Sequence, residues 1–264
     1  MLATMLSEGR AAALSLLMLA GCGAANVPRP SDAPDTDLFA RVVVIGASAS
    51  AGFMLEDSLA DALEVALPQP HQPVLDLASE LLFLAPAENG GEQVEQALAA
   101  DPSLVIAIDF LFWFGYGDVG GDEPRIALLE TGLALLERFD CPVVVGGFPD
   151  MSAAIGTMLR PEHVPSPAAL ARLEARLAEW ARGRDDVVLV DLAGTLARLG
   201  SGEPVELFGR TWPPDDDELL QWDHLHPTDH GLVALAGIVL ERVAAEHPRA
   251  RITFDPGDVF AAID

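Results

Sequence analysis

The chain has 264 residues, half of them apolar and about a fifth charged, which is typical of a globular protein with a sizeable core. Its 41 acidic residues outnumber its 15 basic residues, all of them Arg, and leave a formal net charge of -26. This charge argues against nucleic acid and against anionic membranes as partners, because both are bound by clustered Lys and Arg. The two cysteines, Cys22 and Cys141, are too few for a disulfide framework, and no apolar run reaches the roughly 18 residues of a membrane span.

The first 22 residues have the plan of an export signal. Arg10 precedes a short uncharged apolar run over residues 11–20, which leads into Leu19-Ala20-Gly21-Cys22. This quartet resembles the lipobox of bacterial lipoproteins, and the resemblance implies that cleavage leaves Cys22 as a lipidated first residue. A plain secretory signal and a buried N-terminal helix are the alternatives.

Three parts of the chain follow from this interpretation. Residues 1–22 are predicted to be a lipoprotein signal peptide, residues 23–39 a flexible tether rich in Ala, Pro, Asp and Gly, and residues 40–264 the folded domain. The protein is then exported and lipid-anchored in the cell envelope, so its partners include a membrane reached through lipidated Cys22. By resemblance to proteobacterial sorting rules, Gly23 favours the outer membrane and periplasm if the organism is Gram-negative.

The domain alternates predicted strands with predicted helices. Short β-branched or apolar runs indicate strands at 41–46, 73–77, 104–108, 142–146 and 187–191. Apolar spacing indicates helices at 53–66, 92–100, 124–139, 166–182 and 228–246. Five apolar strands separated by helices predict an α/β fold with a parallel sheet covered on both faces. Ligands of such folds lie at the carboxyl ends of the strands.

A small-residue turn follows the first predicted strand and contains Ser48, in the run Gly46-Ala47-Ser48-Ala49-Ser50-Ala51-Gly52. A Ser in a strand-to-helix turn can present its hydroxyl at a helix N-terminus, where backbone N–H groups favour developing negative charge. Tight backbone packing explains such a turn equally well. The run is not the G-x-S-x-G elbow of α/β hydrolases, which would need Gly at position 50.

A second candidate segment precedes the last predicted helix and reads Asp223-His224-Leu225-His226-Pro227. A Ser hydroxyl becomes a good nucleophile when an imidazole takes its proton and a carboxylate holds the other ring nitrogen. Asp223 and His226, three residues apart in a turn, can pair in that way.

These two segments resemble the SGNH/GDSL hydrolase family. The run at 46–52 matches the family's first block, G-D-S-x-S/T-x-G, except for Ala47 in place of Asp, and the run at 223–227 matches its last block, D-x-x-H-P. The resemblance covers roughly residues 40–246. It implies a flavodoxin-like three-layer α/β/α sandwich in which Ser48 is the nucleophile, His226 the base and Asp223 the residue that orients it.

The match is incomplete at the oxyanion hole, for which the family uses the N–H of the Ser, the N–H of a Gly and an Asn side chain. Ser48 supplies the first donor, and Ser79 is the best positional match for the second, with Gly90 and Gly91 as a weaker option. The only Asn residues are Asn26 and Asn89, so the family's Asn is missing. The indole N–H of Trp113 or the hydroxyl of Tyr116 could replace it, whereas an ionised Asp109 aimed at the oxyanion would oppose catalysis.

Two further segments allow more than one interpretation. The aromatic run after the third strand, residues 110–116, is either an apolar acyl pocket or lid beside Ser48 or part of the core, and the Gly residues at 115, 117, 120 and 121 favour a mobile loop. His224, His226 and His230 could form a metal site, although surface or capping roles for His224 and His230 fit better. No metal and no cofactor is expected.

The sequence therefore predicts a serine esterase or lipase-type hydrolase that cleaves a carboxylic ester through an acyl-enzyme. Its substrate would be a small-molecule, lipid or glycan ester. The alternative is a catalytically degenerate surface lipoprotein of the same fold that binds a lipid or glycan.

Overall fold

The computed structural model describes residues 37–208, 210–212 and 219–263 of the chain. These residues belong to one compact unit. The predicted signal peptide at 1–22, with Cys22, lies outside the described residues, as does the predicted tether up to residue 36. Leu38 and Phe39, at the end of the predicted tether, are buried in the hydrophobic core.

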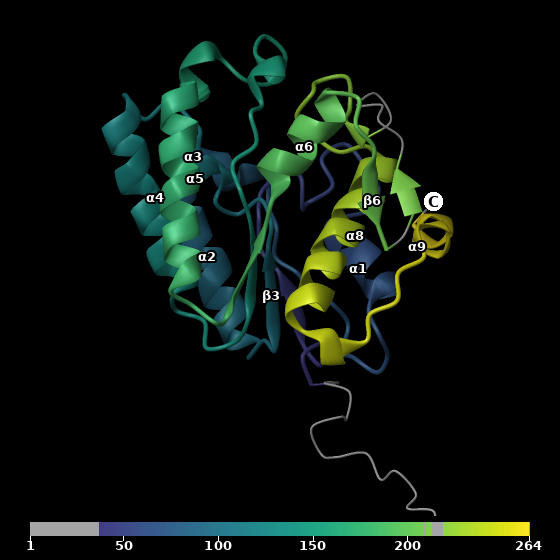
Figure 1. Cartoon of the computed structure of the whole chain (residues 1–264). Helices are drawn as coiled ribbons and strands as arrows, with labels where there is room; N and C mark the ends of the chain where they lie inside the picture. The colour runs from purple at the N-terminus through teal and green to yellow at the C-terminus, as the bar shows by residue number, and fades with distance from the viewer. Residues whose placement is uncertain (1–36, 209, 213–218, 264) are drawn as a thin grey trace, which may run out of the picture. The chain divides into compact units, whose positions relative to one another are not determined.

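A five-stranded parallel sheet with the order β2-β1-β3-β4-β5 forms the centre of the molecule (Figure 1). The strands are β1 (Val42–Val44), β2 (Leu75–Asp76), β3 (Leu104–Ala107), β4 (Val143–Gly146) and β5 (Val187–Val190). One row of paired residues crosses the whole sheet through Leu75, Val43, Val105, Val143 and Val187. This is the strand order of flavodoxin-like doubly wound folds, as predicted.

Helices cover both faces of the sheet (Figure 1). One face packs on α2 (Pro86–Ala99), α3 (Phe112–Gly115), α4 (Asp122–Leu136) and α5 (Pro167–Arg182). The other face packs on α1 (Leu59–Ala66) and α8 (Asp229–Glu246), and α9 (Pro256–Ala262) packs on these two helices. Side chains alternate between the two cores, since Val42 and Val44 join one cluster while Val43 and Ile45 join the other. The predicted three-layer sandwich is confirmed.

Several short elements were not predicted. They are α3, α6 (Leu192–Gly200), α9, the antiparallel pair β6 (Val205–Leu207) and β7 (Arg210–Trp212), and the 3₁₀ turns Glu80–Leu84, Ser152–Ala154, Pro161–His163 and Pro248–Ala250. Of these, α6 matters for function because it directly follows β5 and so begins at the carboxyl edge of the sheet.

Helix α1 begins six residues later than the sequence indicated. Its N-cap is Ser58, whose hydroxyl accepts from the N–H of Asp61, while the Asp61 carboxylate accepts from the N–H of Ser58. This capping box fixes the helix start at Leu59. Ser48 therefore lies in a turn well before the helix, and the expected help from a helix N-terminus does not apply to it.

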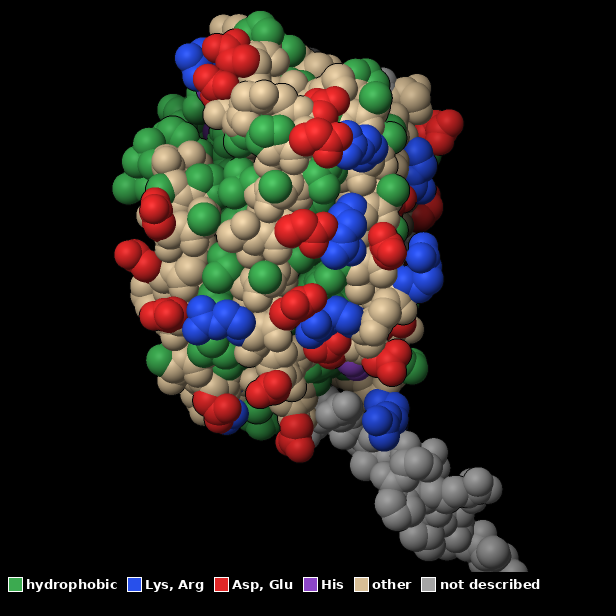
Figure 2. All heavy atoms as spheres, turned by 90° about the vertical axis from the view of Figure 1, so that its left-hand side faces the viewer, with side chains coloured by type: hydrophobic (Ala, Val, Ile, Leu, Met, Phe, Trp, Pro, Cys, Tyr) green, Lys and Arg blue, Asp and Glu red, His purple; other side chains and the backbone are tan. Residues whose placement is uncertain are grey.

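The outer face of α4 and α5 carries paired charges (Figure 2). Arg172 contacts Glu123 at 2.8 Å and Arg176 contacts Glu130 at 2.5 Å, so each pair links the two helices. Exposed pairs of this kind contribute about 0–1 kcal/mol each. No helix within the described ranges is long and apolar enough to cross a membrane.

The aromatic run after β3 is mostly core. Phe110, Phe114 and Tyr116 are fully buried. Gly115 lies where a Cβ would come within 2.5 Å of the Phe148 ring, so close packing explains this glycine and the expected mobile loop is wrong at that position. Phe112 alone of this group lines the pocket at Ser48.

Candidate active site

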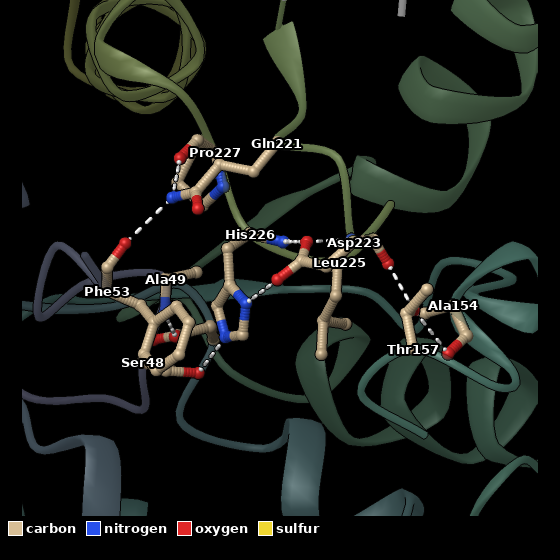
Figure 3. A network of polar contacts seen from close by, with 11 residues as sticks. Ser48, Ala49, Phe53, Ala154, Thr157, Gln221, Asp223, Leu225, His226 and Pro227 are labelled. Carbon is tan, nitrogen blue, oxygen red and sulfur yellow. Dashed lines mark hydrogen bonds and ion pairs between the residues drawn. The ribbon is translucent and has the colours of Figure 1, made fainter. Parts of the chain in front are cut away.

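Ser48 lies in a tight turn at the carboxyl end of β1, immediately after the sheet (Figure 3). The turn is closed by the N–H of Ala51, which donates to the carbonyl of Ala47, and by the N–H of Phe53, which donates to the carbonyl of Ser48. Gly52 has φ +73°, a conformation that glycine adopts without strain. The turn thus fixes the backbone on both sides of the Ser48 hydroxyl.

The structure brings together the three residues that the sequence proposed for catalysis, which lie up to 178 positions apart. The Nε2 of His226 lies 2.8 Å from the Oγ of Ser48, and its Nδ1 lies 2.7 Å from the Oδ2 of Asp223 (Figure 3). Both distances are those of hydrogen bonds. With Nδ1 protonated and bound to the carboxylate, Nε2 is free to accept the proton of the Ser48 hydroxyl.

The Asp223 carboxylate is fully buried yet well supplied with donors. Burial alone would raise the pKa of Asp223, but the His226 ring and the N–H groups of His226 and Leu225 hold it below its usual value. Asp223 is therefore ionised at neutral pH and stabilises a positive charge on His226.

The loop that carries Asp223 and His226 is tied to both sides of the site (Figure 3). The Gln221 side chain donates to the carbonyls of Phe53 and Pro227, at 2.7 and 2.8 Å. The Phe53 ring stacks on the His226 ring with a centroid distance of 4.1 Å. On the other side, the Thr157 hydroxyl bonds the carbonyl of Asp223 at 2.9 Å. These contacts fix the position and the ring plane of His226.

Asp109, directly after β3, binds the turn that holds Ser48. Its Oδ1 accepts from the N–H of Ala47 and the hydroxyl of Ser50, and its Oδ2 accepts from the N–H groups of Ala49 and Ser50. Burial raises the pKa of Asp109, and these hydrogen bonds act in the opposite direction. Both oxygens face the turn, so the carboxylate fixes the backbone around Ser48.

A second buried polar side chain fixes the start of the same turn. The amide of Gln93, on α2, accepts from the N–H of Gly46 at 3.0 Å and donates to its carbonyl at 2.9 Å. A Cβ at Gly46 would lie 2.1 Å from the Oδ1 of Asp109, so only glycine fits there. The structural roles of Gln93 and Asp109 were not predicted from the sequence. The only signals were a polar residue on a buried helix face and an Asp at the carboxyl end of an apolar strand.

The backbone N–H of Ser48 is the available donor for an oxyanion, because it bonds no acceptor in the described part of the chain. The N–H of Ser79 is already used, since it donates to the carbonyl of Gly46 at 3.0 Å. In this structure Ser79 therefore does not direct its backbone donor at Ser48.

The two aromatic candidates for a replacement donor lie elsewhere. The Trp113 ring packs between Phe83 and Phe112 and is not part of the pocket lining. The buried Tyr116 hydroxyl donates to the carbonyl of Pro149 and accepts from the N–H of Met151. The site as described thus offers one oxyanion donor where the resemblance implies three.

An apolar pocket opens beside the Ser48 hydroxyl and extends between α6 and α8. The pocket and the open solvent at its entrance together have a volume of about 970 Å³. Both Ser48 and His226 line the pocket. Apolar concave sites with a few convergent polar groups are typical of small-molecule sites.

The histidine cluster does not assemble into a metal site. His226 is committed to Ser48 and Asp223, while the His230 ring stacks on Phe260 at 4.5 Å. Across the described ranges, no group of three His, Cys, Asp or Glu side chains is placed to hold a metal ion.

The chain is similar to known proteins in its three-dimensional structure, while the sequence comparisons find no match. No protein-family model and no curated protein matches the sequence. The lipase/acylhydrolase from Enterococcus faecalis superposes with a TM-score of 0.55 at 18% identity, over 81% of this chain and 97% of that chain. A protein named as a candidate acylhydrolase from Bacteroides fragilis superposes with a TM-score of 0.53 at 16% identity, over 83% and 91%. The chain therefore has the same three-layer α/β fold as these acylhydrolase structures.

Proposed function

We propose that the protein is a serine hydrolase of SGNH type that cleaves carboxylic esters. The single observation that carries this proposal is the continuous hydrogen-bonded chain from the Ser48 hydroxyl through His226 to the buried Asp223 carboxylate, at 2.8 and 2.7 Å. The names of the structural neighbours agree with an acyl-transfer reaction.

The reaction follows from the position of each proton. Ser48 Oγ attacks the ester carbonyl carbon while its proton passes to Nε2 of His226. The negatively charged oxygen of the tetrahedral intermediate accepts a hydrogen bond from the Ser48 N–H. The intermediate then expels the alcohol, which takes the proton from Nε2. Water, deprotonated by His226, attacks the acyl-Ser48 ester and releases the carboxylic acid and the free hydroxyl. Asp223 stabilises the imidazolium in both halves and keeps Nδ1 protonated.

Turnover is expected to be slow for an enzyme of this kind, because the Ser48 N–H is the one donor of a hydrogen bond to the oxyanion among the described residues. Each missing donor typically lowers the rate by about 10²–10³-fold. Activated esters with good leaving groups, such as p-nitrophenyl acetate, are therefore the suitable first substrates.

The competing function is a degenerate hydrolase fold that binds a lipid or glycan without cleaving it. The sparse oxyanion hole favours it. Intact hydrogen bonds in the triad favour the enzyme, because binding alone does not require a base aligned on a hydroxyl.

The test is hydrolysis of p-nitrophenyl acetate by the full chain, compared with the variants Ser48→Ala and His226→Ala. Turnover that is lost in both variants supports the enzyme. Turnover by the parent chain that persists in Ser48→Ala overturns the assignment of the nucleophile. A folded parent chain without turnover supports the binding function.

We also propose, from the sequence, that the protein acts in the cell envelope. A lipid on Cys22 would hold the hydrolase in the cell envelope, at the outer membrane if the organism is Gram-negative. Metabolic labelling with a fatty acid, compared between the parent chain and Cys22→Ser, tests this. Label that persists in Cys22→Ser contradicts it.

A further inference from the structure

The pocket at Ser48 continues away from the triad between α6 and α8. Leu192 and Leu196 of α6 form one wall, and Ala234, Leu235 and Ile238 of α8 form the other. Gly231 and Ile238 both line it, and seven residues of helix rise about 10 Å. The pocket is thus long enough for an extended chain of several methylene groups.

The walls of this part of the pocket offer almost nothing polar to a ligand. Thr195 is the one polar side chain contributed by α6 and α8, and its hydroxyl already donates to the carbonyl of Asp191 at 2.7 Å. At the mouth, both oxygens of Asp109 are bound by the Ser48 turn. A hydrocarbon chain suits this surface, whereas a sugar or a charged group would lose its hydrogen bonds to water there.

We propose that this α6–α8 pocket binds the acyl chain of the substrate, and that the substrates are esters of medium-chain fatty acids. The inference rests on the proposed function, because it places the reacting carbonyl at Ser48. The acyl part stays on Ser48 through both halves of the reaction. An alcohol bound in the pocket would have to leave past the acylated Ser48 before water could react.

The length dependence follows from burial of apolar surface. Each methylene that enters an apolar pocket is expected to raise kcat/KM roughly fourfold, until the pocket is full. The ratio of kcat/KM for p-nitrophenyl octanoate to that for p-nitrophenyl acetate therefore measures occupation of the pocket.

Two substitutions in α8 change this ratio in opposite directions. Ala234→Leu fills the pocket and is expected to lower the octanoate-to-acetate ratio by roughly tenfold or more. Ile238→Ala lengthens the pocket and is expected to move the preferred substrate from octanoate toward laurate. The matched control is Ala245→Leu, on the exposed side of the same helix, which is expected to leave the ratio unchanged.

The experiment uses the full chain with p-nitrophenyl esters of two to sixteen carbons, and with octyl acetate beside ethyl acetate. A rising profile that Ala234→Leu flattens supports the acyl pocket. A flat profile that neither pocket variant changes, in a protein that still hydrolyses p-nitrophenyl acetate, contradicts the acyl-chain pocket but not the hydrolase function. A preference for octyl acetate over ethyl acetate also overturns it, since the pocket then takes the alcohol. Absence of turnover on every ester contradicts the proposed hydrolase function, and the acyl-chain pocket that rests on it.

Discussion

The carboxylate of Asp109 binds Ser50 twice, through the hydroxyl at 2.6 Å and through the backbone N–H at 3.1 Å. Ser50 lies two residues after the nucleophile, and the same carboxylate also accepts from the N–H groups of Ala47 and Ala49. The residues on either side of Ser48 are thus bound to one buried group. We propose that Asp109, from its place after β3, positions Ser48 by binding this turn, in which Ala47 stands where the SGNH first block has Asp.

Replacing Asp109 by Asn tests this positioning role. The amide keeps one acceptor oxygen but presents an NH₂ group to donors, so at least one backbone N–H loses its partner. The expected cost is about 1–3 kcal/mol of stability. Loosening of the turn is expected to lower kcat more than it raises KM. Urea unfolding and p-nitrophenyl acetate kinetics measure the two effects.

The matched control is Asp185→Asn, an exposed aspartate remote in sequence from the turn, which is expected to change neither quantity. A variant Asp109→Asn with the kcat of the parent chain would show that the carboxylate does not position Ser48.

Gly46→Ala probes the close approach between the turn and Asp109. The added methyl group would lie 2.1 Å from the Oδ1 of Asp109 and 2.8 Å from the Oγ of Ser50, so both side chains or the turn itself must shift. Overpacking of this kind typically costs about 1–3 kcal/mol. We expect a lower midpoint of thermal unfolding and a large loss of esterase activity. Gly202→Ala adds the same methyl group in open space, although at a positive φ, and is expected to retain activity.

The variant Asp223→Asn tests the pairing with His226 through activity. An amide can hold Nδ1 of His226 in the unprotonated form, which leaves Nε2 protonated and unable to accept the Ser48 proton. Loss of the correct tautomer in a serine triad lowers kcat by about 10⁴-fold. A variant with kcat within a factor of ten of the parent chain would remove Asp223 from the mechanism.

The same variant makes a prediction for stability against pH. The pKa of Asp223 is lower in the folded than in the unfolded chain, so the ionised group stabilises the fold. This contribution is complete above the unfolded pKa of about 3.9 and is lost as the pH falls through the folded pKa. Urea unfolding should show Asp223→Asn less stable than the parent chain at pH 7, with a smaller difference at pH 3. An equal difference at both pH values contradicts this.

Tyr116→Phe separates a structural from a catalytic hydroxyl. The buried oxygen bonds both Pro149 and Met151, and its removal leaves their two backbone groups unpaired. The expected effect is a loss of about 1–3 kcal/mol of stability with activity retained in the folded protein. Trp113→Phe is likewise expected to retain activity. A fall of about a hundredfold in kcat for either variant would identify a missing oxyanion donor.

The sheet and the meeting of Ser48, His226 and Asp223 were predictable from sequence for a clear physical reason. Each buried parallel strand is a short apolar run, and the candidate catalytic residues follow a strand or precede a capped helix, as Ser48 and His226 do. Thr228 caps α8, and its side chain accepts from the N–H of Gly231.

The support of the site was not predictable from local patterns. Asp109 and Gln93 gain their roles from residues 59 to 62 and 47 positions away, and no spacing within the sequence marks such contacts. The prediction of a mobile loop after β3 was wrong at Gly115 for a related reason. Its glycines suggested mobility, whereas Gly115 serves close packing against Phe148.

The most direct test of the account is the reaction of the full chain with a fluorophosphonate probe, followed by mass spectrometry of the labelled peptide. The account predicts one phosphonyl group on Ser48, with labelling lost in Ser48→Ala and strongly slowed in His226→Ala, because Nε2 of His226 activates the Ser48 hydroxyl. A folded parent chain that takes up no label, or one that is labelled at another residue, would contradict it.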